Sequence, residues 1–161
     1  MEDVAAEAGI TRLIVYRHFD SKQGLYDAVL EQVSHRLREA VIERMRPGQL
    51  APGAAEAMIT VARSDPAAFT LLWRHASREP QFAEHARQIH TQVVNGAGDL
   101  LSAQTALAPE LRGWAATTLV AFLIDAVLAW LDEGDPANDP RFVEVMGRSM
   151  PALVRTWSIQ S

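Results

Sequence analysis

Apolar residues recur every three or four positions along most of the chain, which is the spacing of amphipathic α-helices. The strict alternation of apolar and polar residues that marks a strand is nearly absent. Four prolines stand where a helix tolerates them, at its first turn. They are Pro66, Pro80, Pro109 and Pro140. Asp65 and Asp139 precede two of these prolines as capping carboxylates, so the pattern predicts an all-α fold.

Breaks rich in Gly, Pro, Ser and Asp divide the chain into eight predicted helices. Their approximate ranges are 1–8, 11–18, 22–46, 53–64, 66–77, 80–104, 109–132 and 140–158. We expect two units: residues 1–46, which include a long connecting helix, and residues 47–161. In the connecting helix, one stripe that steps by four runs over about six turns. Its members are Leu25, Val29, Val33, Leu37, Val41 and Met45.

The helix over 109–132 is apolar on nearly every side, and its segment 114–131 just reaches the roughly 18 apolar residues that suggest a membrane span. Asp125 lies near the centre of this segment, and an ionised group there is costly in a bilayer. We therefore expect a helix covered by its own chain and by a second chain. The last helix contains Pro151 four residues after Gly147, which eases the proline clash and favours a kinked but continuous helix.

Composition narrows the class of protein. The 161 residues include no Cys, which excludes disulfides, iron–sulfur clusters and cysteine zinc sites. The net charge of −5 argues against coating nucleic acid by bulk charge, but leaves room for a small reading surface. Glu2 and Asp3 stand where a secretory signal would be basic, so we expect a cytoplasmic protein without a membrane partner.

Residues 1–19 have the pattern of a helix-turn-helix unit. Val4, Ala5 and Ala8 form the apolar face of the first short helix, and Gly9 permits the tight turn. Thr11 follows as a helix cap.

The second short helix presents polar residues outward in a way that suits a DNA groove. Arg12 is able to pair with guanine, and Leu13 or Tyr16 to touch a thymine methyl group. Arg17 shares this face, while Lys22 begins the next helix, where a phosphate oxygen is favoured. The alternative for the basic residues is a solvated face. For the flanking His18 it is a structural histidine at a helix end.

Residues 1–30 closely resemble the DNA-binding segment of the TetR (tetracycline-repressor-like) family of transcriptional regulators. The resemblance rests on Tyr16-x-His18-Phe19, Ser21-Lys22 and Leu25-Tyr26. It implies an all-helical, dimeric regulator that binds a palindromic operator in double-stranded DNA. In it the residues that face bases or the nearby backbone are Thr11, Arg12, Leu13, Tyr16 and Arg17, and those that hold phosphates are His18 and Lys22.

One feature departs from the family. Its members carry a further N-terminal helix, and Met1 stands where their second helix begins. Three explanations stay open: a gene start placed too far downstream, residues that precede the printed chain, or a shortened protein. We favour the first two, and in the third case operator binding is in doubt.

The resemblance also implies a ligand cavity among the helices of residues 53–132, and a four-helix dimer interface from the last two helices of each chain. Twelve apolar residues supply the area for that interface, although core positions are an equal alternative for Trp114 and Trp157. They are Trp114, Leu119, Phe122, Leu123, Val127, Trp130, Phe142, Val145, Met146, Met150, Leu153 and Trp157.

Ligand candidates are polar or aromatic groups embedded in apolar helices. Asp125 is the first, with Thr118 on the same face; its alternative is a bond to a neighbouring helix or to an arginine across the dimer. The others are Met58, Phe69, Trp73, His90 and Phe122. Such residues are commonly core residues. Their apolar character points to an unknown hydrophobic or amphipathic effector.

Catalysis is not expected. His75, His85 and His90 stand near Glu79 and Glu84, but they lack the spacing of a helical zinc site, and no nucleophile elbow or phosphate loop is present. We expect no cofactor, no metal and no enzymatic activity. The sequence thus predicts a ligand-responsive repressor that acts as a homodimer. The alternative is a helical dimeric ligand-binding module without DNA binding.

Overall fold

The computed structural model describes residues 19, 21–44 and 50–158. Six α-helices lie within them: α3 (Lys22–Arg44), α4 (Leu50–Ser64), α5 (Pro66–Thr70), α6 (Pro80–Gln104), α7 (Pro109–Glu133) and α8 (Asp139–Trp157). A π-helical turn (Leu71–His75) and a 3₁₀ turn (Ala76–Arg78) join α5 to α6, and a second 3₁₀ turn (Pro136–Asn138) precedes α8. These residues contain no strand, which confirms the all-α prediction.

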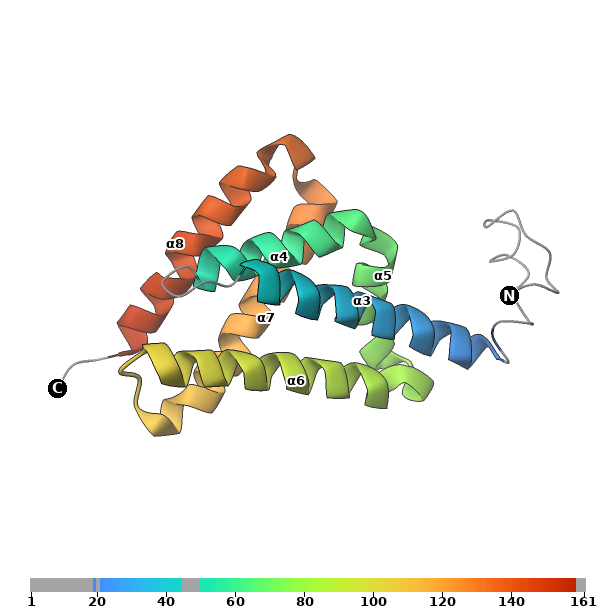
Figure 1. Ribbon diagram of the computed structural model, residues 1–161, viewed down its shortest axis with the longest axis horizontal. Helices are drawn as coiled ribbons and strands as arrows, with labels where there is room; N and C mark the ends of the chain where they lie inside the picture. The colour runs from blue at the N-terminus through green and yellow to red at the C-terminus, as the bar shows by residue number, and fades with distance from the viewer. Residues whose placement is uncertain (1–18, 20, 45–49, 159–161) are drawn as a thin grey trace.

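The helices form a bundle in which α3 lies between α4 and α6, with α8 on the left of the view (Figure 1). Helix α4 packs against both α3 and α8, and α7 packs against α6 and α4. The predicted two-helix unit over 1–18 lies outside the described residues. Helix α3 follows that predicted unit in sequence, and its packing shows how the chain enters the bundle.

Helix α3 buries the centre of the predicted stripe, Val33 and Leu37, together with positions beside it. Its buried residues are Leu30, Val33, Ser34, Leu37 and Ala40. Leu25, Val29 and Val41 are only half-buried, and Met45 lies outside the described residues. The prediction stepped by four residues, whereas an α-helix turns every 3.6, so the contact face moves around the helix and includes Leu30.

Proline marks the helix starts as predicted, at Pro66, Pro80 and Pro109. The Asp65 carboxylate caps α5 by accepting a hydrogen bond from the Ala68 amide at 3.1 Å. Asp139 was expected to cap α8 in the same way, and this was wrong. It is the first residue of α8, after Asn138, and its carboxylate binds other helices instead.

The predicted helix over 66–77 is divided by the π-turn and the 3₁₀ turn. Helix α4 starts at Leu50, three residues earlier than predicted, because Pro52 in its first turn is tolerated.

Helix α8 runs without a break through Pro151, as predicted. Gly147 also serves a purpose not read from the sequence. A Cβ atom there would lie 3.1 Å from the Cβ of Pro52, so its absence lets α8 approach α4 closely.

Helix α7 is long and apolar enough to cross a membrane by length and composition alone. Eight of its residues are nevertheless buried by the rest of the chain: Ala115, Ala116, Leu119, Val120, Leu123, Ile124, Val127 and Leu128. Asp125 is exposed on this helix, and so are the apolar residues Leu111, Trp114 and Phe122. Much of its apolar surface thus belongs to the chain's own core, as expected for a helix covered by neighbours.

Candidate functional site

The start of α3 is the part of the predicted DNA-contacting surface that the structure describes. Lys22 is its first residue and is exposed, with its Nζ 5.8 Å from the centre of the Tyr26 ring. The Ser21 hydroxyl accepts a hydrogen bond from the Gly24 amide at 3.0 Å and so caps the helix. The remaining amides and the positive end of the helix dipole favour an anion beside Lys22.

An aromatic stack ties this end of α3 to the start of α6. The rings of Tyr26 and Phe82 lie 4.2 Å apart with an angle of 11° between their planes. Phe82 is 1% exposed, so the contact is part of the core. Gln23 Nε2 adds a long hydrogen bond of 3.5 Å to the carbonyl oxygen of Gln81. Together these contacts hold the two helix starts side by side.

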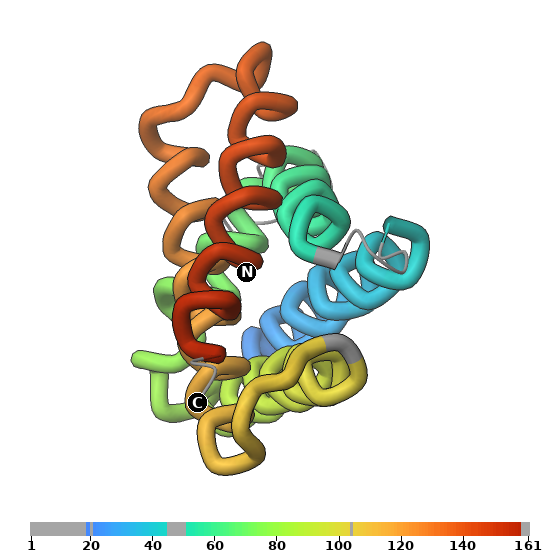
Figure 2. The backbone as a smooth tube through the Cα atoms, turned by 90° about the vertical axis from the view of Figure 1, so that its left-hand side faces the viewer, coloured from blue at the N-terminus to red at the C-terminus, as the bar shows by residue number. Residues whose placement is uncertain are grey.

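A large cavity of about 710 Å³ lies between α3, α4, α6, α7 and α8. In Figure 2 the backbone of α8 runs on the left of the view and that of α3 on the right. The wall of the cavity is mainly aliphatic. Representative residues from each helix are Leu37, Met58, Val93, Leu123 and Val154. The volume falls within the range of about 300–1,000 Å³ typical of ligand sites.

Few polar groups line this central cavity. The hydroxyls of Ser34 and Thr105 donate to backbone carbonyls of their own helices, at 2.8 and 2.7 Å. Arg38 reaches from α3 to Gln92 of α6 at 3.5 Å and binds Glu31 at 2.9 Å. Arg155 of α8 also lines the wall. An apolar molecule with one polar end suits this distribution.

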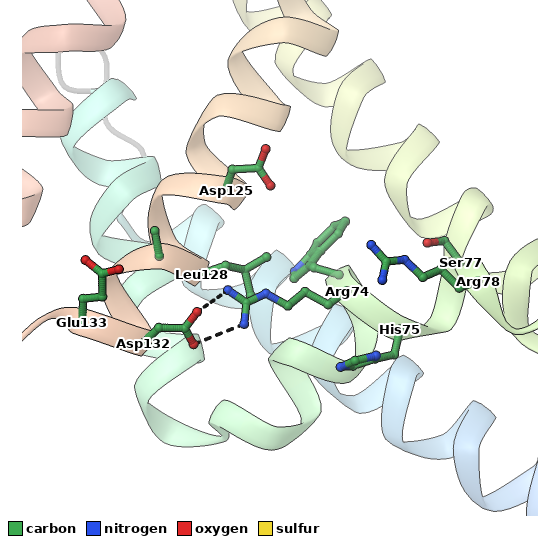
Figure 3. Close-up of a pocket in the computed structure, with 10 residues that line it drawn as sticks. Arg74, His75, Ser77, Arg78, Asp125, Leu128, Asp132 and Glu133 are labelled. Carbon is green, nitrogen blue, oxygen red and sulfur yellow. Dashed lines mark hydrogen bonds and ion pairs between the residues drawn. The ribbon is translucent and has the colours of Figure 1, made fainter.

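A second, charged cleft of about 450 Å³ lies between the π-turn and the C-terminal half of α7 (Figure 3). Arg74 from the π-turn pairs with both carboxylate oxygens of Asp132, at 3.2 and 2.5 Å. These bonds raise the pKa of Arg74 and lower that of Asp132, and the nearby charge of Asp125 raises the pKa of Arg74 further. The two walls of the cleft thus carry opposite charges.

Several large apolar side chains of α7 and α8 are exposed. Trp114 is 51% exposed and Val145 44%, and Leu111 and Phe122 are also exposed. Trp114 packs against Trp157 with ring centres 4.6 Å apart. Five of the twelve predicted interface residues are instead buried in the chain's own core: Leu119, Leu123, Val127, Phe142 and Met146.

Asp139 joins three helices in a partly buried cluster. Its carboxylate accepts hydrogen bonds from Arg63 Nε at 3.1 Å and Nη2 at 3.0 Å, and from Trp130 Nε1 at 2.7 Å. Arg63 also donates to the carbonyl oxygen of Gly134 at 3.0 Å. The Arg63 bonds, followed by that from Trp130, lower the pKa of Asp139 against the opposing effect of burial.

Two comparisons with known proteins found similar sequences. Residues 1–29 match the family model described as "Bacterial regulatory proteins, tetR family". The HTH-type transcriptional activator FasR of Mycolicibacterium smegmatis is 28% identical over 149 residues, covering 89% of this chain and 68% of FasR. Both matches support a TetR-like transcriptional regulator. The family match falls on the segment whose motifs predicted it.

Six of the seven predicted DNA-contacting residues of this TetR-like regulator lie outside the described residues. They are Thr11, Arg12, Leu13, Tyr16, Arg17 and His18. Lys22 is exposed at the start of α3, where its ammonium group and the helix N-terminus favour a phosphate. These contacts stay predictions.

The predicted ligand residues of the regulator fall in different places. Met58 lines the central cavity, while Trp73 and Asp125 line the charged cleft. Phe69 is fully buried, and its ring centre lies 6.3 Å from that of Trp73. His90 is half-buried, with its ring centre 6.3 Å from that of Trp73 on another side.

Thr118 is half-buried, and Phe122 is 36% exposed. Neither residue lines the central cavity or the charged cleft. The structure therefore does not bring the seven ligand candidates of the regulator together in one site.

Sequence reasoning missed most of the central cavity wall, because it comes from five helices and is built from ordinary aliphatic residues. One signal was available in α6. Gly96 and Ala97 place small residues where a larger side chain would occupy the cavity. No group of three or more His, Asp or Glu that is able to hold a metal occurs in the residues searched, which are those described.

Proposed function

We propose that this regulator is a ligand-responsive repressor that binds a palindromic operator as a homodimer. The observation that carries the proposal is the central cavity, whose wall includes α3, the helix that follows the matched DNA-binding segment. The predicted contact residues would supply base and phosphate recognition: Thr11, Arg12, Leu13, Tyr16, Arg17, His18 and Lys22. The relative FasR is named an activator, so the sign of regulation is itself a point for the test.

The contacts between α3 and α6 support coupling of the central cavity to DNA binding. Near the start of α3, Tyr26 and Phe82 stack closely. Toward its other end Leu37, Arg38 and Val41 face the cavity, and Arg38 reaches α6 only through a 3.5 Å contact. An effector that binds more tightly when α3 and α6 are apart would favour that arrangement and shift operator affinity.

The effector we propose is hydrophobic or amphipathic. Aliphatic side chains dominate the wall, and burial of an apolar molecule there contributes about 25 cal/mol per Å² of surface removed from water. Arg38 and Arg155 offer positions for one polar or anionic end.

Self-association is supported by the exposed apolar side chains of α7 and α8. Trp114, Phe122 and Val145 expose large apolar surfaces on these two helices, and such surfaces often mark a protein interface. A homodimer would also supply the two recognition helices, about 34–36 Å apart or a multiple of it, that a palindromic operator requires.

The proposal divides the chain into two functional units. Residues 1–46 form the DNA-binding unit with its connecting helix, and residues 47–161 form the unit for effector binding and dimerisation. The protein acts in the cytoplasm and is not an enzyme, in agreement with the regulatory names of the matched family and of FasR. A dimeric ligand-binding module without DNA binding is the second candidate.

Binding to duplex DNA from the region upstream of its own gene tests the proposal. The 161-residue chain is compared with a form extended upstream in frame, over a series of salt concentrations. We expect specific binding by the extended form. The logarithm of its binding constant should fall linearly with the logarithm of the salt concentration. Lys22→Ala should reduce the salt slope by about 1, whereas Arg87→Ala on exposed α6 should leave it unchanged.

The two candidate functions give different results in this experiment. Binding by neither form, with a stable dimer in both, would favour the ligand-binding module and contradict the repressor. A reporter gene driven by the bound region then shows the sign: loss of the regulator should raise expression for a repressor and lower it for an activator.

A further inference from the structure

The charged cleft has walls from two parts of the fold. The π-turn and the following 3₁₀ turn provide Arg74, His75 and Arg78, and α7 provides Asp125 and Asp132. In Figure 3 the Asp125 carboxylate and the Arg78 guanidinium extend from opposite sides of the cleft. None of the residues that line this cleft also lines the central cavity, so the two spaces are separate.

Among the described residues that line the charged cleft, one ion pair joins its two walls. Arg74 is occupied by its two bonds to Asp132. Asp125 and Arg78 form no hydrogen bond or ion pair with each other or with other described residues. A carboxylate and a guanidinium therefore face a common space that neither fills, and a molecule with both charges would meet both groups.

The backbone and the floor of the charged cleft are also unusual. Residues Leu71–His75 form a π-helical turn, a rare conformation that often occurs at functional sites. Within this turn the indole Nε1 of Trp73 is buried and lacks a hydrogen-bond partner. Trp73 and Leu128 provide an apolar floor beside the charged groups. The volume of about 450 Å³ is large enough for a small molecule.

We infer that the charged cleft is a second ligand site, for an amphoteric molecule of about amino-acid size. Its anionic group would bind Arg78 and His75, its cationic group would bind Asp125, and a short aliphatic part would lie on Trp73 and Leu128. This inference does not depend on the effector proposed for the central cavity. It gives the regulator a means of responding to a polar metabolite that the aliphatic cavity would exclude.

Three probes with related carbon skeletons test the need for both charges. Isothermal titration calorimetry is run on the full chain with α-aminobutyrate, butyrate and n-propylamine. Only α-aminobutyrate carries both charges, so we expect saturable heat from it and at least about tenfold weaker binding of the other two.

Two variants and their controls locate the site. Asp125→Asn and Arg78→Gln should each weaken α-aminobutyrate binding about tenfold or more, because each removes one charge-assisted contact. Asp99→Asn and Arg87→Gln alter exposed residues of α6 that do not line the charged cleft, and should leave binding unchanged. Thermal unfolding of each variant checks that it folds.

Two kinds of result would overturn the inference. The first is no saturable binding of α-aminobutyrate, equal binding of all three probes, or binding unaffected by either variant. The second concerns Asp125, which is exposed on α7 near the helices proposed for self-association. If Asp125→Asn weakens dimerisation in sedimentation experiments and α-aminobutyrate does not bind, the charged cleft belongs to the interface between two copies.

Discussion

The two sides of the bundle are held together in different ways. On one side α4, α7 and α8 meet through the Asp139 cluster and the close approach of Gly147 to Pro52. On the other side α3 and α6 are joined near their starts by the stack of Tyr26 on Phe82, and farther along both helices line the central cavity. The first side forms a frame, and the cavity beside α3 and α6 leaves a space in which we expect the end of α3 to shift.

The largest loss of stability is expected from a substitution in the Asp139 cluster, which joins α4, α7 and α8. Asp139→Asn replaces the carboxylate that binds Arg63 and Trp130 and leaves the guanidinium without its charge partner. Both side chains of the ion pair are mostly buried, with 23% and 20% exposure, so we expect a loss of about 3 kcal/mol in the free energy of unfolding. Urea denaturation measures this change. Asp99→Asn on exposed α6 is the control, and equal stability of the two variants would contradict the role of the cluster.

The same cluster makes a prediction for acid pH. Because the folded state lowers the pKa of Asp139 below its usual 3.8, its contribution is present above that value and is lost as the pH falls through the lowered pKa. The stability difference between the wild type and Asp139→Asn should therefore shrink from pH 7 toward pH 3. Urea denaturation across this range measures it. A constant difference would show that the charge of Asp139 does not matter.

Overpacking the contact of α8 with α4 should have the next effect. Gly147→Val places side-chain atoms where a Cβ alone would lie 3.1 Å from Pro52, and we expect a loss of about 2 kcal/mol. Gly113→Val is the matched control, since a Cβ there meets nothing within 4 Å. Thermal unfolding of both variants compares them. If they were equally stable, close packing at Gly147 would not be part of the frame.

The stack of Tyr26 on Phe82 should contribute less to stability but more to operator affinity. Tyr26→Leu keeps an apolar side chain but removes the ring that lies on Phe82, which should cost about 1 kcal/mol. If the stack holds the start of α3, operator affinity should change more in this variant than in Val29→Leu, an alteration elsewhere on the same helix. Fluorescence anisotropy with operator DNA measures the affinity, and equal values would contradict this role.

Much of the fold was predictable because its signals are local. Pro66, Pro80 and Pro109 begin helices as predicted, and Asp65 caps its helix through an amide three residues away. The motifs of residues 1–30 indicated the same family whose model matches residues 1–29. These features depend on neighbours in the sequence.

Long-range features were not predictable in the same way. Asp139 was expected to be a cap, but it binds Arg63, which is 76 positions away. The central cavity combines side chains from five helices, and none of them differs in type from core residues. The charged cleft depends on a π-turn that joins residues far from α7 in sequence.

We propose that occupation of the cavity moves the far part of α3 while its start stays beside α6. Because the chain has no Cys, introduced cysteines carry spin labels at unique positions. One variant carries Glu39→Cys with Asn95→Cys, toward the cavity, and another carries Ala28→Cys with Glu84→Cys, near the stack; all four positions are exposed.

Pulsed electron spin resonance on these variants, diluted with unlabelled protein, is recorded with and without dodecanol, an apolar probe. We expect dodecanol to lengthen the distance between positions 39 and 95 and to leave that between positions 28 and 84 unchanged. Ala97→Phe, which fills the cavity, should abolish the response to dodecanol, whereas Ala103→Phe outside it should not. Unchanged distances in both pairs with dodecanol bound would show that occupation of the cavity does not move α3.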